Sequence, residues 1–260
     1  MSPLYETSLS DAAWELIQPI FSSQSSRGRP RIHEIRFIID AILYLAKNGC
    51  TWRCLPSDFP PWKTVYLRFR NWSISGQWQA TSEILTSIAR VCAGKALSPT
   101  LASVDSQSQS AEPGVDSRGL DGGKKVNGRK RHIVVDTLGL LLICMVTAAN
   151  EADGNAGQRL VDALTNNKLF STLKKILGDN SYRGVDGVSV EASEREKGQK
   201  GFVAEAFRWA VERTFAWFNR QRRLVRNYEK RILHQESMIY IANIRICLKR
   251  YEKWISKFGI

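Results

Sequence analysis

The feature that most constrains the fold is a pair of apolar segments in the middle of the chain. HIVVD (132–136) and LLLICMVTAA (140–149) are separated only by Thr137-Leu138-Gly139. Two apolar runs joined through a short glycine-containing loop predict a β-hairpin. The second run is too short to span a bilayer as a helix, which takes about 20 apolar residues. We therefore expect the chain to fold around a sheet that contains this hairpin.

Other segments predict the strands and helices that accompany the hairpin. The expected strands are LASVD (101–105), LKKILGD (173–179) and GVSVE (187–191), and the expected helices are 155–167, 204–225 and 236–258. The order strand, hairpin, helix, strand and helix is that of a ribonuclease H-like domain, in which helices pack on a mixed sheet. We therefore predict an α/β (α+β) domain of this type over residues 98–260.

The first 95 residues predict helices instead of strands. Four segments have apolar residues spaced three and four apart, as on one face of a helix. These segments begin at Ser10 or Asp11, span 35–48, begin at Pro60-Pro61, and span 79–93. Proline suits the first turn of a helix, and Asn48-Gly49 suits a helix end. A helical domain over residues 1–95 is predicted.

The third of these helices has the pattern of a DNA-reading helix. Its apolar face is formed by Trp62, Val65, Phe69 and Trp72. The basic residues elsewhere on its surface are Lys63, Arg68 and Arg70. In a helix-turn-helix protein an apolar back docks such a helix while basic side chains reach phosphates and base edges. The alternative is a small helical bundle with an ordinary charged surface.

The charge balance favours a polyanionic partner. Lysine and arginine number 38 against 25 acidic residues, a net charge of +13. Nucleic acid is the first candidate and an anionic membrane surface the second. The N-terminus lacks the order of a secretion signal, so we expect a cytoplasmic protein. Five scattered cysteines do not predict a disulfide framework, and Cys50 and Cys54 lack the second pair that a zinc site needs.

Three acidic residues occupy positions that suit metal-dependent phosphodiester chemistry. Asp105 and Asp179 each end a predicted strand, and Glu212 lies at the edge of the apolar stripe of a predicted helix. Carboxylate oxygens are ligands that Mg²⁺ or Mn²⁺ prefers, and two such ions can activate the attacking oxygen and stabilise the leaving one. The alternative is structural: an aspartate at a strand end often makes a turn, and a glutamate on a basic helix often pairs with arginine.

Five stretches of the chain resemble the DDE transposases of the IS-five family of bacterial insertion sequences. They occur in the family's order and span most of the chain. The stretches are NGCTWRCLPSDFPPWKTVYLRFRNW (48–72), SVDSQS (103–108), DGGKKVNGRKRHIVVDTLG (121–139), GDNSYRG (178–184) and RWAVERTFAWFNRQRRL (208–224). The resemblance implies that Asp105, Asp179 and Glu212 are the family's catalytic, metal-binding triad and that Arg208 matches its arginine four residues before the glutamate.

The resemblance also gives the basic residues near the acids an expected role. They would hold the DNA backbone across the site without reading its sequence. These residues are Lys124, Lys125, Arg129, Lys130, Arg131, Arg213, Arg220, Arg222 and Arg223. The alternative for each is solvated surface charge. His132 and Tyr182 adjoin the motifs, and we interpret both as structural.

The resemblance therefore predicts a transposase that binds the terminal inverted repeats of its element and cuts and joins double-stranded DNA, including a target. Two Mg²⁺ or Mn²⁺ ions and a homodimer assembled on DNA are expected. A second hypothesis is a catalytically inactive relic that represses or competes at the element ends. A third is a structure-specific nuclease of the same fold, which the match across residues 48–72 disfavours.

One segment departs from the family pattern. Only fifteen residues (185–199) separate GDNSYRG from KGFV (200–203), where a helix and a strand are expected. A crossover between parallel strands normally takes at least a dozen residues with its helix. We predict that the strand near 188–190 is displaced from the sheet and that 185–200 is irregular. Glu212 would still face Asp105 and Asp179, with activity reduced or lost.

Overall fold

The computed structural model describes residues 5–21, 32–182, 184–185, 189–192 and 208–259. Its first part is helical, as predicted. The elements are α1 (Asp11–Phe21), α2 (Ile35–Asn48), the 3₁₀ turn η1 (Trp52–Cys54), α3 (Trp62–Ile74) and α4 (Gln77–Cys92). The Ser10 hydroxyl accepts from the Ala13 amide at 3.2 Å, which identifies Ser10 as the cap of α1. Gly49 ends α2 with a φ of 74°, a conformation that favours glycine.

A mixed sheet follows the helices and contains the predicted hairpin. Its strands are β1 (Leu101–Ser110), β2 (Gly119–Asp121), β3 (Val126–Asp136), β4 (Leu141–Ala148), β5 (Lys175–Gly178) and β6 (Ser189–Ala192). The order is β2-β3-β1-β5-β6. β4 pairs with residues 129–135 of β3, beyond the short stretch that β2 pairs with. The β1–β3 and β3–β4 pairs are antiparallel, whereas β1–β5 and β5–β6 are parallel. This arrangement is the mixed sheet expected for the ribonuclease H-like class.

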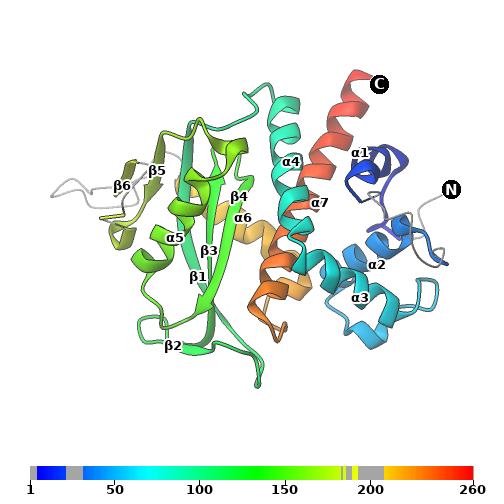
Figure 1. Ribbon diagram of the computed structural model, residues 1–260, viewed down its shortest axis with the longest axis horizontal. Coiled ribbons are helices and arrows are strands. Elements are labelled where there is room, and N and C mark those ends of the chain that lie inside the picture. Colours follow the sequence, from blue (N-terminus) through cyan, green and yellow to red (C-terminus); the bar gives the residue numbers. More distant parts are fainter. Residues whose placement is uncertain (1–4, 22–31, 183, 186–188, 193–207, 260) are drawn as a thin grey trace.

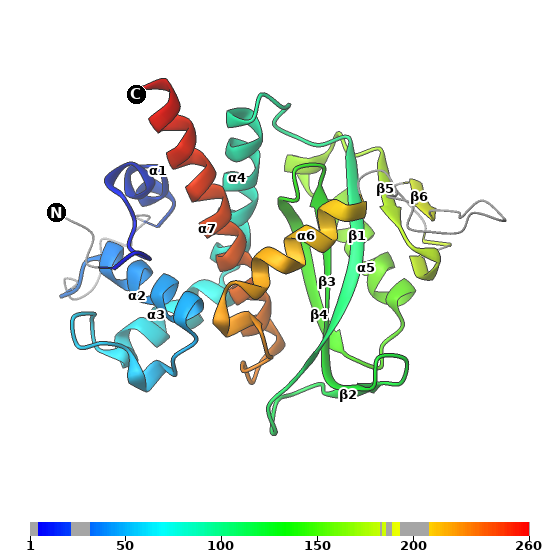
Figure 2. The same cartoon turned by 180° about the vertical axis from the view of Figure 1, so that it is seen from behind.

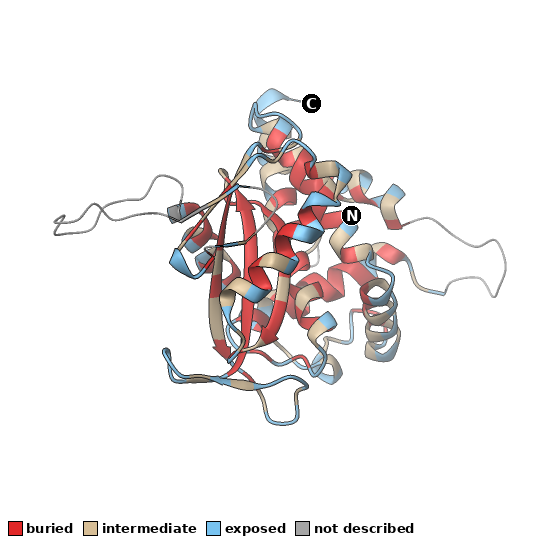
Figure 3. Cartoon of the chain, turned by 60° about the vertical axis from the view of Figure 1, so that its left-hand side comes forward, coloured by how far each residue is buried: buried red, intermediate tan, exposed pale blue. Residues whose placement is uncertain are grey.

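Helices cover both faces of this sheet (Figures 1 and 2). On one face α5 (Asp153–Thr165) packs on a core that includes Val104, Val134 and Leu160. On the other face lie α6 (Arg208–Asn219) and α7 (Ile232–Phe258). Figure 2 shows α6 crossing β1 and β3 on that side. The strands β3 and β4 are buried along most of their length (Figure 3), because helices cover both faces of this part of the sheet.

The helical half and the sheet share one hydrophobic core. A continuous cluster of buried residues extends from Leu9 in the first turn of the chain to Leu248 in α7 and includes Ile133 in β3. α7 packs along α4 and contacts α1, α2 and α3 as well (Figure 1). The change from helix to sheet lies between Cys92 and Leu101, where the sequence predicts the boundary. The helices before that point nevertheless pack around a helix from the far end of the chain.

The prediction of a displaced strand after Gly184 is wrong. β6 pairs with β5 in parallel, with Lys175 opposite Ser189 and Gly178 opposite Ala192. The connection contains the 3₁₀ turn η3 (Asn180–Tyr182) where a crossover helix is usual. Ten residues between the strands can reach about 30 Å when extended, well beyond the roughly 13 Å length of a four-residue strand. A short route can therefore join the two strands. Residues 186–188 and 193–200 lie outside the described residues.

Two further boundaries differ from those predicted. The helix expected to run to Val225 ends at Asn219 and is followed by the 3₁₀ turn η4 (Arg222–Leu224). Its expected start at 204 lies outside the described residues. The Gln109 side-chain amide donates to the carbonyl of Leu224 at 2.6 Å, and this contact requires a carbonyl that an uninterrupted helix would use internally. β1 also continues five residues past Asp105, because its polar second half pairs with β3.

A half-buried carboxyl group on α7, beside β4, predicts a pH dependence of stability. Glu236 accepts from the Val146 amide at 2.8 Å, and burial raises its pKa from 4.5 to about 7. The folded state thus holds this proton more tightly than the unfolded chain. The stability contributed is fully present below about pH 4.5 and is lost as the pH rises through about 7. The free energy of unfolding of the parent should therefore fall by up to about 3 kcal/mol as this group ionises. Glu236→Gln should abolish this fall, because glutamine does not titrate.

Urea unfolding of the two chains at pH 5 and pH 8 measures the difference. The substituted chain should gain stability relative to the parent at pH 8, whereas Asp162→Asn, which changes an exposed residue of α5, should not. An equal pH response of Glu236→Gln and the parent would show that this carboxyl group does not titrate as described.

Candidate functional site

Two of the three predicted carboxylates lie at adjacent positions of neighbouring parallel strands. Ser103 of β1 pairs with Leu177 of β5, so two residues further on Asp105 lies beside Asp179. Val104 packs in the core on the α5 side. Because successive side chains of a strand point to opposite faces, Asp105 points to the α6 face. Asp179 directly follows the last residue of β5. It is two residues after Leu177, so its side chain points to the same face of the sheet as that of Leu177.

The local backbone fixes both carboxylates. One Asp105 oxygen accepts from the Ser106 amide at 2.7 Å. One Asp179 oxygen accepts from the Ser181 amide at 2.9 Å and from the Ser181 hydroxyl. Both side chains are half-buried. The serines that follow the two aspartates therefore hold them at the strand ends, which explains the small polar residues in both motifs.

Tyr182 and Asp153 lie close to the two aspartates. The sequence did not predict that these four residues gather in one place. Burial raises the Tyr182 pKa first of all, and the charges of Asp153, Asp105 and Asp179 raise it further. Asp153 accepts from the Ser106 hydroxyl at 3.0 Å and pairs with Lys130 at 2.9 Å. The sequence signal for this group was Ser106, which follows Asp105 in the polar second half of β1. This polar group supports the end of β1 from the α5 side.

Glu212 lies on α6, on the side of that helix nearest β1. It is exposed, next to the fully buried Val211. Seven residues later, on the same side of the helix, Asn219 accepts from Arg131 at 2.8 Å. Arg131 also donates to Gln107, two residues beyond Asp105 in β1.

The direction of α6 relates Glu212 to Asp105. Gln107 contacts Asn219 through Arg131, and Gln109 contacts Leu224 further along both segments, so α6 runs in the same general direction as β1. From this shared contact Glu212 lies about 10 Å back along the helix, and Asp105 about 7 Å back along the strand. The third carboxylate is thus displaced in the same direction as the first, over the same face of the sheet.

The donor set fits a divalent cation in chemistry, and the structure brings two of the three donors together. Carboxylate oxygens suit hard cations. Within the described parts of the chain, no three His, Cys, Asp or Glu side chains converge closely enough to hold a metal ion. Cys50 and Cys54 are free thiols. The candidate centre is therefore the Asp105–Asp179 pair, with Glu212 on the helix above it.

Comparison with known proteins identifies the family. A model described as "Putative transposase of IS4/5 family" matches residues 9–81, and two models of the transposase DDE domain match residues 97–188 and 186–249. An uncharacterized 16.2 kDa protein of insertion element IS402 from Burkholderia cepacia is 30% identical over 107 residues, which are 38% of this chain and 71% of that protein. The chain belongs to the IS4/5 family of DDE transposases.

Two further comparisons describe the extent of the likeness. The "Putative transposase for insertion sequence element IS402" of Burkholderia cepacia is 28% identical to this transposase over 132 residues, which are 46% of the chain and 63% of that protein. The crystal structure of a pre-cleavage Mos1 transpososome aligns over 99% of the chain and 90% of its own at 11% identity, with a TM-score of 0.20. We infer nothing about the fold from so low a score.

Family membership places this transposase among enzymes that act on DNA with divalent metal ions. No helix in the described residues is long and apolar enough to cross a membrane. The apolar run of residues 141–148 forms strand β4, which pairs with β3.

Three members of the predicted basic run are buried inside this transposase. Arg129 donates to the Asp116 and Glu229 carbonyls and to Asn227. Lys130 pairs with Asp153. Arg131 lies over the rings of Phe215 and Phe218, and burial lowers its pKa to about 9. The expectation that these three side chains face DNA is a misassignment, because a buried cation is bound by internal partners.

Other predicted DNA contacts also have internal roles. Arg223 is buried and pairs with Glu229 at 2.7 Å. The half-buried Arg213 stacks on Trp209 and Trp217, with its guanidinium carbon 4.0 and 4.7 Å from the ring centroids. The Arg208 side chain lies outside the described residues. Neither Arg213 nor Arg223 presents its guanidinium group freely at the surface.

The remaining predicted basic residues are accessible. The exposed ones are Lys63, Lys124, Lys125, Arg220 and Arg222, and the half-buried ones are Arg68 and Arg70. Lys63, Arg68 and Arg70 belong to α3, whose Val65 and Phe69 are buried. Lys124 and Lys125 lie in the turn between β2 and β3.

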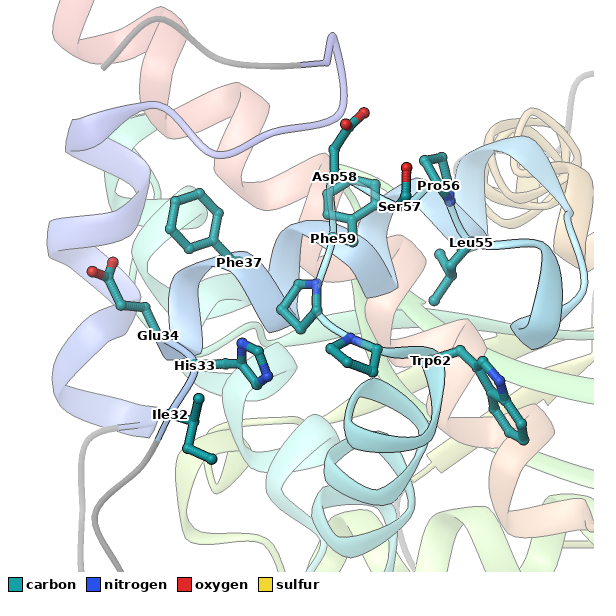
Figure 4. Close-up of a pocket in the computed structure, with 12 residues that line it drawn as sticks. Ile32, His33, Glu34, Phe37, Leu55, Pro56, Ser57, Asp58, Phe59 and Trp62 are labelled. Carbon is teal, nitrogen blue, oxygen red and sulfur yellow. The ribbon is translucent and has the colours of Figure 1, made fainter.

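A shallow groove of about 690 Å³ borders the start of α3 (Figure 4). Segments 32–34 and 55–62 line it, together with Phe37. Arg53 lies over the Trp62 ring, 5.4 Å from its centroid. Its lining includes three prolines and the acidic residues Glu34 and Asp58, so the groove is not built to bind phosphate.

Proposed function

We propose that this transposase binds the terminal inverted repeats of its element and cleaves and joins DNA strands through Asp105, Asp179 and Glu212. The observation that carries the proposal is the adjacency of Asp105 and Asp179 on the face of the sheet that α6 crosses. Two carboxylates from distant parts of the sequence meet there, and Glu212 lies on the helix that covers that face.

The proposed metal ligands are these three carboxylates, and the proposed ions are two Mg²⁺ or Mn²⁺. When bound, such ions supply activation of the attacking oxygen and stabilisation of the leaving oxygen in phosphodiester displacement. Asp105 and Asp179 are held by the amides of Ser106 and Ser181, so they need little reorganisation to bind a cation. Two neighbouring carboxylates also repel each other, which favours cation binding between them.

The proposed DNA surface consists of two accessible basic regions. One is α3, with Lys63, Arg68 and Arg70, and it would read the element ends. The other includes Lys124 and Lys125 in the β2–β3 turn, together with Arg220 and Arg222 after α6. These exposed cations would hold the phosphate backbone near the carboxylates. A homodimer on DNA would bring two ends and the target together.

A cleavage assay with the full chain tests the proposal. Labelled duplexes that carry the ends of the element are incubated with the purified chain and Mg²⁺ or Mn²⁺, and a chelator is added in parallel. Strand cleavage that depends on the metal supports the proposal. Binding to the ends without any cleavage would support the inactive relic instead. Cleavage governed by DNA structure and not by the end sequence would support the nuclease hypothesis.

Substitutions in α3 are expected to weaken recognition of the element ends. Lys63→Ala, Arg68→Ala or Arg70→Ala should each reduce the salt dependence of binding by about one phosphate contact, or cost about 1–3 kcal/mol where a base edge is read. Competition binding of the full chain to end and random duplexes, at several salt concentrations, measures both effects. Lys168→Ala, an exposed lysine beside α5, is the matched control. Unchanged affinity and salt slope in all three α3 variants would place recognition elsewhere.

A further inference from the structure

We propose that the turn between β3 and β4, residues 136–140, positions α6 and thereby Glu212, with Thr214 as the residue that fixes the helix to the turn. This inference rests on the proposed function, in which Glu212 is the third metal ligand. Glu212 belongs to no strand of the sheet, so its place over Asp105 and Asp179 depends on how α6 is docked. The turn supplies the contacts at the Glu212 end of that helix.

The turn has a fixed internal structure built on one buried carboxylate. Asp136 is fully buried, and one of its oxygens accepts from the Leu138 amide at 2.9 Å and the Leu140 amide at 2.8 Å. The Asp136 carbonyl accepts from the Gly139 amide at 2.9 Å. Gly139 has a φ of 74°, which a side chain would disfavour. The carbonyls of Leu138 and Gly139 are thereby held in a set direction.

α6 docks on these two carbonyls. The buried Thr214 hydroxyl donates to the Gly139 carbonyl at 2.7 Å. The Ala210 carbonyl oxygen, one turn earlier in α6, lies 2.9 Å from the Thr214 hydroxyl oxygen. Arg213 donates to the Leu138 carbonyl at 3.0 Å. A Cβ atom on Gly139 would lie 2.9 Å from the Thr214 hydroxyl oxygen and 3.1 Å from the Trp217 ring. The helix and the turn are therefore in close contact, with no space for a larger residue.

The turn is also held by helices α4 and α7. Arg250 of α7 donates to the Leu138 carbonyl at 2.9 Å, and the second Asp136 oxygen accepts from Arg90 of α4. The Thr86 hydroxyl of α4 donates to the Leu141 carbonyl at 2.9 Å. Because two other helices also hold the turn, it gives α6 a fixed support at the Glu212 end.

Thr214 is two residues from Glu212, about 3 Å along the helix axis and about 200° around it. With Thr214 facing the turn, Glu212 lies on the other flank of α6, which it shares with Asn219 near β1. A small roll or slide of the helix on the turn would move the Glu212 carboxylate relative to the two aspartates. Thr214 and Arg213 touch no reacting group in this arrangement and act as positioning residues.

Thr214→Val and Thr214→Ser in the full chain test the proposal. Valine keeps the shape and removes the hydroxyl, whereas serine keeps the hydroxyl. Thr214→Val should lower strand cleavage by about 100-fold, the size expected for a misplacement near 1 Å. Its affinity for MnCl₂, followed by electron paramagnetic resonance, should fall by about 10-fold, as when a supporting residue of a metal site is lost. Thr214→Ser should keep both cleavage and Mn²⁺ affinity near those of the parent. Binding to an element-end duplex should stay within about twofold of the parent in each variant.

The outcomes separate this proposal from the proposed function. If Glu212→Gln abolishes cleavage while Thr214→Val cleaves and binds Mn²⁺ as the parent does, the positioning role is overturned and the function stands. If Glu212→Gln cleaves normally, the proposed triad itself fails. Should Thr214→Val not fold, as judged by thermal melting, Arg213→Lys provides the second variant. It keeps the charge but shortens the reach to Leu138, and parent-like cleavage and Mn²⁺ binding by Arg213→Lys would equally overturn the proposal.

Discussion

Alanine at Asp105, Asp179 or Glu212 is expected to lower metal-dependent strand cleavage by about 1,000-fold or more. A bound metal ion stabilises the transition state by several kcal/mol, and each 1.4 kcal/mol corresponds to about tenfold in rate. Binding to element-end DNA should stay within about twofold, because the accessible basic residues are untouched. Gel assays of cleavage and binding on the same duplex measure the two properties together.

The matched control for these variants is Asp162→Ala. Asp162 is exposed on α5, which covers the opposite face of the sheet, so its loss should change neither cleavage nor binding. Near-parent cleavage by any one of the three variants would exclude that residue from the triad. A parallel loss of DNA binding would instead mean that the substitution disturbs the fold.

The largest effect on stability is expected from Asp136→Ala. Asp136 forms a buried ion pair with Arg90, whose side chain is only 6% exposed. Its loss leaves that cation without its carboxylate and removes the acceptor of two turn amides. Breaking a buried pair from one side costs about 3–5 kcal/mol. Chemical denaturation of the full chain should show a loss of that size.

An exposed ion pair provides the comparison. Glu151 and Arg159 form a pair in which the arginine side chain is 51% exposed, and Glu151→Ala should cost less than about 1 kcal/mol. If Asp136→Ala cost no more than Glu151→Ala, the β3–β4 turn would not depend on the buried carboxylate as described.

The apolar elements could be predicted from the sequence because one signal determined each of them. The hairpin of β3 and β4 follows from two apolar runs and the Leu138-Gly139 turn, and the stripe of Ile38, Ile42 and Leu45 predicts α2. That Asp105 and Asp179 belong to one site was implied by the family resemblance, because the strand pattern alone does not show which strands pair. Strand ends of a parallel pair meet at one edge, and β1 and β5 are such a pair.

The basic run could not be interpreted from sequence alone. In the sequence Arg129 and Arg131 resemble surface cations, but in β3 both side chains point into the protein. Arg129 contacts Asn227, and Arg131 contacts Asn219 and the ring of Phe215. Those partners lie about 90 residues later in the chain. Local pattern does not report a partner at such a distance, and a buried arginine is rare enough that an exposed one is the ordinary expectation.

The β5–β6 connection differed from prediction for a different reason. The expected displacement assumed that a parallel pair needs a crossover helix, as most do. In the described part of this connection, the 3₁₀ turn Asn180–Tyr182 follows β5. Tyr182 from that turn is buried against Gly157 and Gly178, where added Cβ atoms would lie 2.6 and 3.1 Å from its side chain. Two glycines thus make room for the ring that anchors the turn, a long-range fit that the short segment itself does not reveal.

The most direct measurement is a crystal structure of the chain bound to an element-end duplex and Mn²⁺, with the anomalous signal of manganese recorded. We predict anomalous peaks between Asp105 and Asp179, with Glu212 as a further ligand and the scissile phosphate alongside. Manganese bound only at other residues, with the Asp105–Asp179 pair empty beside the bound DNA, would contradict the proposed active site.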